Sequence, residues 1–581
     1  MSGRAPYGTW KSPIIAERVS GSSTSIDDII VDAVTSVVYH LEGRPADKGR
    51  CVLVESLTGC EIVPKDVNVR SGVHEYGGAA AIVHDGVAYY SNFADNRVYK
   101  IGVKEGSQPE AVTPGISICG FDIHPVHPQF LVSVLEDHTI DSPLTVTNTL
   151  VIIDAEAKTI DTSTTSLVDI TVNTSSEVAF SNSTTVADEG SNGYISWVNM
   201  DTLCFVSDVS GFINPWTYSV STEKASPVFS SPVNEDFGSA MWLMCYFPYA
   251  IVDEDGKVAV FKAFRDGRSI LYRVDLGTGE RQEVQSPYVV VESVRTVSRS
   301  QGQFAFLGSK VDESQKVIIG SMMDTDQASF TSLNTMSDEV NRKFFDASLV
   351  SIPQGMTLKV PLNDEPLQVI YYSPHNPALD VNYGGSTGYG KAYMDRLKQQ
   401  WGKVDVEDCI AAAQILSNPP YSLIDPRRIV IRGSSAGGFT LLNCLSNSSN
   451  PQIFAAATSL FAVVDVERLV RDIHKFESQY MFLLAGGSPT NTEPLKAVSP
   501  INHFDRIDCP LLILQGEKDR VVPKEQAEIL YESVKKRGGI VEYKLYPGEG
   551  HGLRMKETLC DAFEREFEFY QRVLGFRDAP P

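Results

Sequence analysis

Apolar and polar residues alternate in short runs between about residue 25 and residue 345. Examples are "GVAYYSNFADNRVYKIG", which starts at Gly86, and "GRSILYRVDLGTGE", which starts at Gly267. Alternation with a period of two is typical of β-strands, and the Asp-Gly and Gly-Thr-Gly turns between the runs indicate hairpins. No long amphipathic helix interrupts this region. The runs recur about every 40 to 50 residues, which favours a β-propeller of about six to seven blades over an array of β-sandwiches.

Near residue 350 the pattern changes, because apolar runs now alternate with segments of helical periodicity. "RIVIRG" and "PLLILQG" predict strands, whereas "VEDCIAAAQILS" and "KEQAEILYESVKKRG" predict helices. Such alternation predicts a doubly wound, mostly parallel sheet with helices on both faces. We therefore expect a propeller domain over residues 1–348, with an N-terminal segment that packs on the second domain, and an α/β domain over residues 349–581. Functional loops of such a sheet follow the carboxyl ends of its strands.

The composition narrows the function further. The chain has 581 residues, 42% of them hydrophobic, and a formal net charge of −23. This acidic balance argues against binding to nucleic acid or to a membrane surface, since both need basic patches. The nine cysteines are scattered without a C-x-x-C pair, and neither a signal-peptide core nor a run of about 18 apolar residues occurs. A cytoplasmic protein is expected, and a homo-oligomer is compatible with these data.

The motif G-x-S-x-G, in which a serine hydroxyl is presented on a sharp strand-to-helix turn, occurs twice. Gly433–Gly437 follows the apolar run "IVI" and opens into "AGGFTLLNCLS", a predicted helix, with Ser435 at the central position. Gly384–Gly388 is followed by a tyrosine and another glycine, which predicts a loose turn in place of a helix start. Ser435 is therefore the candidate nucleophile.

Two later residues are candidates for the partners of Ser435. Asp519 follows the apolar strand "LLILQG", and His551 lies in the glycine-rich loop after "YKLYP". α/β-Hydrolases place their triad in the order nucleophile, acid, histidine, and this chain has that order. A serine hydroxyl needs a histidine to take its proton and a carboxylate to orient the imidazole. The sequence thus predicts a catalytic triad of Ser435, Asp519 and His551.

Other stretches give weaker signals. His124 and His127 have H-x-x-H spacing, but the intervening and following prolines forbid the helix that would bring both rings to one metal ion. The stretches at residues 73–78 and 135–138 are interpreted either as lining of a substrate channel or as polar anchors in β-turns. "RDIHKFES", residues 471–478, is interpreted either as a scaffold helix or as a lid that contacts substrate.

These residues resemble the prolyl oligopeptidase family of serine peptidases, and most closely its dipeptidyl and acylaminoacyl peptidases. The resemblance covers nearly the whole chain and is strongest in "VNYGGSTGYGKAYMDRLKQQWGKVDVEDC", "IRGSSAGGFT", "LQGEKDRVVP" and "GEGHG", with "DFGSAMW" added by the first half. It implies a propeller that restricts access to an α/β-hydrolase, with Ser435 as nucleophile, Asp519 as orienting acid and His551 as base. It also implies cleavage of short peptides at or near their N-termini, and leaves the exact mode of cleavage open.

The stretch "VIYYSPHNPALDVNYGG" departs from the family pattern. Members normally carry a further strand, an "HGGP"-type loop and a helix between its two phrases, and no "HGG" occurs in the chain. That loop would supply one N–H of the oxyanion hole, and the backbone of Ala436 the other. Loss of one donor typically costs about a hundred- to thousandfold in rate. We also expect the neighbours of the lost strand to re-pair or to expose unsatisfied backbone edges.

The Ser/Thr-rich run at residues 159–191 indicates a second gap, or an insertion, in the propeller. A gene model that lacks exon sequence and a naturally degenerate paralogue would each explain both departures. The leading hypothesis is a serine peptidase that acts on peptide substrates and needs no metal or organic cofactor. The alternatives are an esterase or other acyl hydrolase, and a catalytically impaired paralogue that acts as a propeller binding protein.

Overall fold

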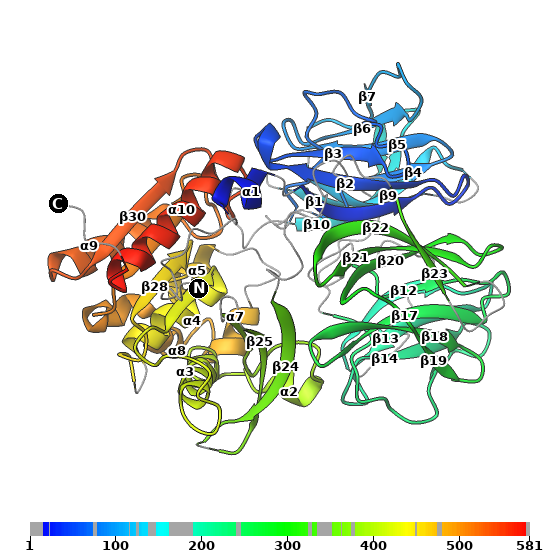
Figure 1. Cartoon of the computed structure of the whole chain (residues 1–581). Coiled ribbons are helices and arrows are strands. Elements are labelled where there is room, and N and C mark those ends of the chain that lie inside the picture. The colour runs from blue at the N-terminus through cyan, green and yellow to red at the C-terminus, as the bar shows by residue number, and fades with distance from the viewer. Residues whose placement is uncertain are drawn as a thin grey trace, which may run out of the picture.

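The computed structural model places two domains side by side, an all-β domain and an α/β domain (Figure 1). It describes residues 15–21, 24–73, 78–115, 117–123, 127–137, 147–161, 190–239, 246–322, 328–333, 351–361, 363–373, 378–447, 450–472 and 479–576.

The described part of the all-β domain forms six antiparallel sheets, each built from strands that are consecutive in the sequence. The first sheet has three strands, β1 (Ser25–Val31), β2 (Val38–Arg44) and β3 (Arg50–Glu55). The second has β4 (Ala81–His84), β5 (Val87–Asn92), β6 (Arg97–Gly102) and β7 (Glu110–Ala111), and the third β8 (Ser117–Ile123), β9 (Phe130–Asp137), β10 (Thr147–Asp154) and β11 (Thr159–Asp161). The fourth has β12 (Asn192–Trp197), β13 (Thr202–Ser207), β14 (Asn214–Ser219) and β15 (Lys224–Pro227). The fifth has β16 (Tyr249–Ile251), β17 (Val258–Arg265), β18 (Arg268–Asp275) and β19 (Arg281–Val284), and the sixth β20 (Val290–Ser298), β21 (Gln303–Lys310), β22 (Glu313–Ser321) and β23 (Ser329–Ser332).

The sheets form a ring because neighbouring sheets bury their apolar faces against each other. Shared hydrophobic clusters join the first sheet to the second, the second to the third, the fourth to the fifth and the fifth to the sixth. A further cluster, which includes Ile29 of β1 and Leu307 of β21, joins the first sheet to the sixth. Asp28 reinforces this closure, since its carboxylate accepts a hydrogen bond from the Ser293 hydroxyl at 3.4 Å. This architecture confirms the predicted propeller, in which period-two alternation buries both faces of each sheet between its neighbours.

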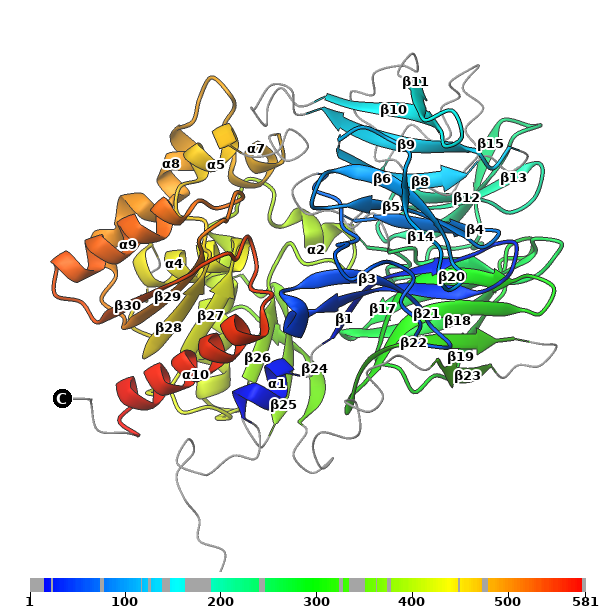
Figure 2. The same cartoon turned by 90° about the horizontal axis from the view of Figure 1, so that it is seen from above.

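The α/β domain contains two sheets. β24 (Ile352–Lys359), β25 (Pro366–Ser373) and β26 (Ala378–Asn382) are antiparallel, and β27 (Val430–Ser434), β28 (Ala456–Leu460), β29 (Leu511–Gly516) and β30 (Val541–Tyr546) are parallel. The described helices are α1 (Ala16–Gly21), α2 (Lys391–Asp395), α3 (Val404–Ser417), α4 (Ala436–Ser446), α5 (Val466–Asp472), α7 (Tyr480–Ala485), α8 (Glu493–Val498), α9 (Lys524–Lys536) and α10 (Lys556–Val573). A 3₁₀ turn lies at Pro500–Arg506, and another, Pro45–Asp47, joins β2 to β3 in the all-β domain. Together the elements confirm the predicted hydrolase-type domain (Figure 2).

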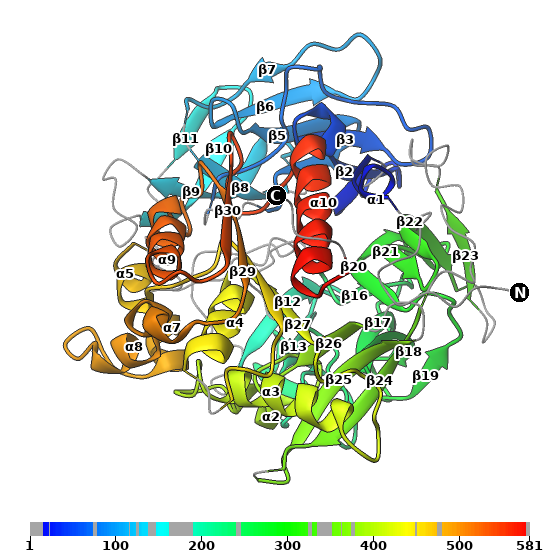
Figure 3. The same ribbon diagram turned by 60° about the vertical axis from the view of Figure 1, so that its left-hand side comes forward.

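Helix α3 holds the two sheets of this domain together. Its residues Ile410 and Ala413 pack in the core under β28 and β29, whereas Ala411 and Ala412 pack against β24 and β25. On the opposite face, α10 packs on β28 and β29, and α1 lies against α10 (Figure 3). Helix α1 therefore contacts the α/β domain. No helix in the described ranges is long and apolar enough to cross a membrane.

β27 is an edge strand in the described part of the chain. The parallel sheet has the order β27-β28-β29-β30, and β26 pairs with β25. Val430, Arg432 and Ser434 are exposed, although β27 leads directly to Ser435. Of the two outcomes expected for a lost neighbouring strand, the structure shows the exposed edge. The "PHNP" phrase at residues 374–377, where the gap was inferred, lies outside the described residues.

Candidate active site

Ser435 lies at a sharp turn between β27 and α4. Its φ of 51° and ψ of −117° are strained for a residue with a side chain, and the turn is possible only because its neighbours are small. A Cβ on Gly433 would lie 2.2 Å from the Gly437 carbonyl oxygen, and a Cβ on Gly438 would lie 2.4 Å from the Ala462 Cβ. The predicted strand–turn–helix at Gly433–Gly437 is therefore present, and it exposes the serine hydroxyl above the sheet.

His551 lies between Ser435 and Asp519. Its Nε2 is 2.9 Å from the Ser435 Oγ, and its Nδ1 is 2.9 Å from the Asp519 Oδ2. An ionised carboxylate can only accept a hydrogen bond, so the neutral imidazole carries its hydrogen on Nδ1 and donates it to Asp519. Its Nε2 is then free to accept a hydrogen bond from the serine O–H. The Phe461 ring packs edge-on against the imidazole at 4.9 Å between centroids and limits its rotation.

Asp519 is fixed by the turn that follows β29. Its Oδ1 accepts the backbone N–H groups of Val521 and Val522 at 3.0 and 2.8 Å, and the Gln515 amide donates to its Oδ2 at 3.2 Å. Its side chain is fully buried, whereas the His551 side chain is 15% exposed. The structure thus brings together all three residues that the sequence singled out. Gln515 was missed, because a glutamine in an apolar strand gives no signal of what it contacts.

Ala436 is the first residue of α4, so its N–H is one of the donors that have no partner within the helix. The N-terminal end of the helix also carries a partial positive charge. This N–H is a candidate donor to a developing oxyanion beside Ser435, as the motif predicts.

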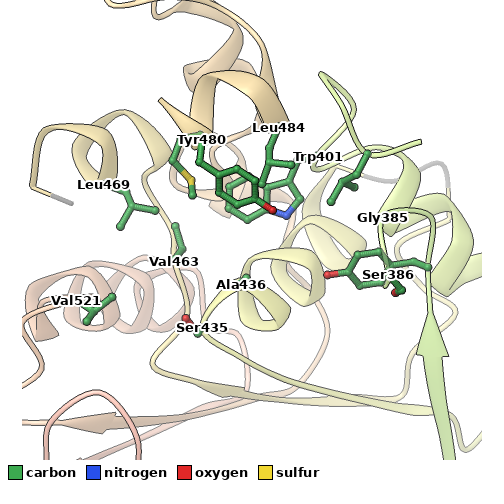
Figure 4. A pocket seen from close by; sticks show the side chains of 13 residues that line it. Gly385, Ser386, Trp401, Ser435, Ala436, Val463, Leu469, Tyr480, Leu484 and Val521 are labelled. Carbon is green, nitrogen blue, oxygen red and sulfur yellow. The ribbon is translucent and has the colours of Figure 1, made fainter. Parts of the chain in front are cut away.

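A cavity of about 280 Å³ opens beside Ser435 (Figure 4). Its lining is mainly apolar, and no charged side chain takes part in it within the described ranges. The lining residues are Tyr383, Gly385, Ser386, Leu397, Trp401, Ser435, Ala436, Val463, Leu469, Tyr480, Met481, Leu484 and Val521. In Figure 4, Tyr480, Trp401 and Leu484 lie on one side of the space and Val463, Leu469 and Val521 on another. The cavity is suited to an uncharged, apolar side chain.

The comparison with known proteins supplies the family. Residues 378–577 match the family model described as "Prolyl oligopeptidase family". This segment belongs to the prolyl oligopeptidase family. The match begins at Ala378, the first residue of β26, and it includes Ser435, Asp519 and His551.

Curated proteins similar to this chain include dipeptidyl peptidase family member 6 of Caenorhabditis elegans, which is 25% identical over 244 residues, 40% of this chain and 32% of that protein. The acylamino-acid-releasing enzyme of Rattus norvegicus is 30% identical over 204 residues, 34% of this chain and 27% of that protein. The chain therefore aligns with only about a third or less of the length of these relatives. A puromycin-hydrolysing peptidase of Mycobacterium tuberculosis has a solved structure that superposes with a TM-score of 0.87 at 25% identity, covering 99% of this chain and 98% of that one.

The second G-x-S-x-G of the chain forms part of the cavity wall. Gly385 and Ser386 line the cavity, and α2 begins only after Gly390. The segment is the turn that the sequence predicted, but it is held by several hydrogen bonds and so is not loose. Its place in the wall was not predicted, since its glycines signal a turn without saying what the turn faces.

Several other interpretations fall partly outside the described residues. These are residues 74–77, 138, 124–126 and 473–478, together with the Ser/Thr-rich run at 162–189. His127 is described, and its ring contacts that of Phe130 at 6.3 Å. Among the described residues, no group of three His, Cys, Asp or Glu side chains comes close enough to hold a metal ion.

Proposed function

We propose that this chain is a serine peptidase that hydrolyses short peptides at or near their N-termini. The observation that carries the proposal is the hydrogen-bonded series Asp519–His551–Ser435 on a strained turn beside an apolar cavity. The relatives support it, since they are named dipeptidyl peptidase and acylamino-acid-releasing enzyme. The proposal assigns the propeller to residues 1–348 and the catalytic domain to residues 349–581, a boundary that falls between β23 and β24.

In this mechanism Ser435 Oγ attacks the peptide carbonyl carbon while His551 Nε2 takes its proton. The Asp519 carboxylate stabilises the imidazolium that forms, and the Ala436 N–H donates to the oxyanion of the tetrahedral intermediate. Collapse of the intermediate breaks the C–N bond, and His551 returns the proton to the leaving amine. Water then attacks the Ser435 ester with His551 as base, which releases the acid and restores the hydroxyl.

The cavity defines the substrate preference within this proposal. The side chain on the acyl side of the scissile bond lies next to the nucleophile, and the apolar lining favours an aromatic or aliphatic group there. An uncharged lining offers no counter-ion, so a charged side chain would lose its hydration without compensation. We therefore expect phenylalanine or leucine before the scissile bond to be preferred over lysine or aspartate.

The proposal includes a cytoplasmic location. Among the described residues eight cysteines are free thiols, and five of them are buried, which supports a reducing compartment.

An acyl hydrolase that prefers esters is a second candidate, and the exposed edge of β27 favours it. An oxyanion hole with one backbone donor stabilises the intermediate less, and an ester has a better leaving group than an amide. Matched Phe-containing ester and amide substrates test this directly. If only the ester turns over above its uncatalysed rate, the chain is an esterase.

The first test is labelling with a fluorophosphonate probe, with Ser435→Ala and heat-denatured protein as controls. Labelling that depends on Ser435, followed by release of N-terminal residues from peptides, would support the peptidase. Puromycin belongs in the substrate panel, because the structural relative is described as puromycin-hydrolysing. A folded sample that neither labels nor hydrolyses any substrate would overturn the proposal in favour of a propeller binding protein.

A further inference from the structure

The cavity wall formed by residues 384–390 depends on residues outside its own domain. Gly385, Gly388 and Gly390 have φ values of 117°, 91° and 82°, which residues with side chains rarely adopt. A Cβ on Gly385 would lie 2.7 Å from Leu397, and a Cβ on Gly390 would lie 2.7 Å from the ring of Phe212 in the propeller. Because a glycine-rich turn has many conformations available, this single close-packed one must be fixed by contacts.

Within the α/β domain, one buried carboxylate fixes the start of this turn. The Gly384 N–H donates to the Oδ2 of Asp408 on α3 at 2.8 Å. Arg396 pairs with the same carboxylate at 3.2 Å, and the Asp408 side chain is only 3% exposed. The charge of Asp408 is thus compensated, and the first residue of the turn is attached to α3.

A second carboxylate, from the propeller, fixes the end of the turn. Asp236 Oδ1 accepts the N–H of Ile213 in the propeller at 2.8 Å, and its Oδ2 accepts the N–H of Gly390 at 2.9 Å. Burial raises the pKa of the Asp236 carboxyl group. The neighbouring Phe237 is fully buried among aromatic rings, so Asp236 is attached to a rigid part of the propeller.

Asparagine could not replace Asp236 in this arrangement. The two oxygens of the carboxylate each accept an N–H from a different domain, whereas an amide offers one oxygen and one NH₂ group. In Asp236→Asn, the NH₂ would face an N–H donor on one side or the other. One of the two attachments would therefore be lost.

An ion pair between the domains lies next to this attachment. Lys391 Nζ is 2.6 Å from the Oδ2 of Asp208, and the Lys391 N–H donates to the Gly211 carbonyl at 2.8 Å. The Asp208 side chain is 2% exposed and also accepts the Ser191 N–H at 2.6 Å. The last residues of the turn are thus held to the propeller by both main-chain and side-chain contacts.

We propose that Asp236 of the propeller is a positioning residue of the active site, which holds residues 384–390 as the wall of the substrate cavity, and that the Asp208–Lys391 pair assists it. The inference rests on the proposed hydrolase function and adds a role for the propeller in shaping the substrate site. Asp236 touches neither Ser435 nor His551 in the described hydrogen bonds, so its loss acts on substrate fit and leaves the nucleophile activated.

The test compares Asp236→Asn with Asp32→Asn in the intact chain. Asp32 is a matched control, because it is a fully buried propeller aspartate whose oxygens accept the N–H groups of Asp85 and Gly86, far from the α/β domain in sequence and in contacts. Each variant is measured for KM and kcat with matched Phe and Ala substrates, and for its rate of fluorophosphonate labelling. We expect Asp236→Asn to raise KM for the Phe substrate about tenfold and to leave the labelling rate within twofold of wild type. Asp32→Asn should change neither KM nor the labelling rate.

Lys391 provides the rescue experiment. Lys391→Met should raise KM for the Phe substrate in the same direction, and Lys391→Arg, which keeps the charge, should restore it. If Asp236→Asn keeps the wild-type KM, the inference is wrong. It is also wrong if Asp236→Asn and Asp32→Asn raise KM and slow labelling to the same degree.

The wild type is measured first, so that a failure of the proposed function is separated from a failure of this inference. If the wild type hydrolyses no substrate, the cavity is tested by binding of the uncharged ligand 4-phenylbutanamide, and binding is measured by tryptophan fluorescence. The signal of Trp401 in the cavity wall is identified with Trp401→Phe. Weaker binding by Asp236→Asn than by Asp32→Asn then supports the positioning role, and equal binding refutes it.

Discussion

The two adjacent glycines at the start of α4 allow a sharp test of how tightly the nucleophile turn is packed. At Gly438 a Cβ would lie 2.4 Å from the Cβ of Ala462 and 2.8 Å from its Cα. At Gly437 no atom lies within 4 Å of the corresponding position. Gly438→Ala and Gly437→Ala therefore add the same methyl group to the same helical turn, one against the backbone after β28 and the other into open space.

The expected magnitude follows from these distances. Apolar carbon atoms pack at about 3.5–4.0 Å, so Gly438→Ala must separate α4 from Ala462 by about 1 Å. Overpacking of this kind costs about 1–3 kcal/mol, and the better helix propensity of alanine returns at most about 1 kcal/mol. We expect a net loss of about 1–2 kcal/mol, which for a domain of this size lowers the unfolding temperature by about 2–8 °C.

The same displacement reaches the catalytic groups from two sides. α4 begins with Ala436, directly after Ser435, and Ala462 follows Phe461, whose ring contacts His551. A misplacement of about 1 Å can reduce the rate about a hundredfold. We therefore expect fluorophosphonate labelling of Gly438→Ala to slow by about two orders of magnitude.

The assay measures thermal unfolding and the second-order rate of labelling for both variants and the wild type. Gly437→Ala should unfold at or slightly above the wild-type temperature. If Gly438→Ala unfolds and labels like the wild type, the close contact with Ala462 does not exist in solution. If Gly437→Ala slows labelling as much as Gly438→Ala, the contact is not the cause of the effect.

Three further predictions concern other parts of the molecule. In Asp519→Asn, Oδ1 can still accept the two backbone N–H groups only if the new NH₂ group faces His551 Nδ1. Nδ1 must then accept a hydrogen bond, so the imidazole carries its hydrogen on Nε2 and cannot take the serine proton. Peptide turnover should therefore fall about 10⁴-fold. Burial raises the pKa of Asp405 to about 6 from its ordinary 3.8, so the folded protein favours the protonated carboxyl group. The stability from this group is full below about pH 4 and is lost as the pH rises through about 6. The urea midpoint of the wild type relative to that of Asp405→Asn should therefore be higher at pH 5 than at pH 7.5. The exposed edge of β27 should promote association between chains, and Val430→Lys should reduce the light scattering of concentrated samples.

Each of these predictions has its own control. For Asp519→Asn, an unchanged unfolding temperature separates the wrong tautomer from misfolding, and turnover near the wild-type rate would contradict the orienting role. A pH-independent difference between the wild type and Asp405→Asn would show that Asp405 is ionised throughout that range. Met200→Lys removes a methionine that is 98% exposed on the propeller; if it reduces scattering as much as Val430→Lys, the strand edge is not responsible.

Much of this fold is predictable because its signals are local. Period-two alternation and Asp-Gly turns indicate the hairpins of the propeller, as at β5 and β6. Apolar runs that alternate with helical segments indicate the parallel sheet, since both patterns depend only on neighbours in the chain. The strained turn at Ser435 is also local, because its small neighbours are required within five residues. Asp519 and His551 could be chosen because the carboxyl ends of parallel strands meet at one edge.

The residues that depend on contacts between distant segments were not predictable. Gln515 supports Asp519 only through the way a turn folds back on β29. Trp401 reaches the cavity from the turn between α2 and α3, and Leu484 reaches it from α7. The Asp236 carboxylate bonds to Gly390 across 154 positions of sequence, and no periodic pattern encodes such a pairing. The sequence by itself determined the elements, their order and the strained turn that presents Ser435, because local sterics and burial fix these. The tertiary structure alone decided which carboxylates hold the cavity wall and that β27 lies at an edge, because both follow from how whole domains and sheets pack.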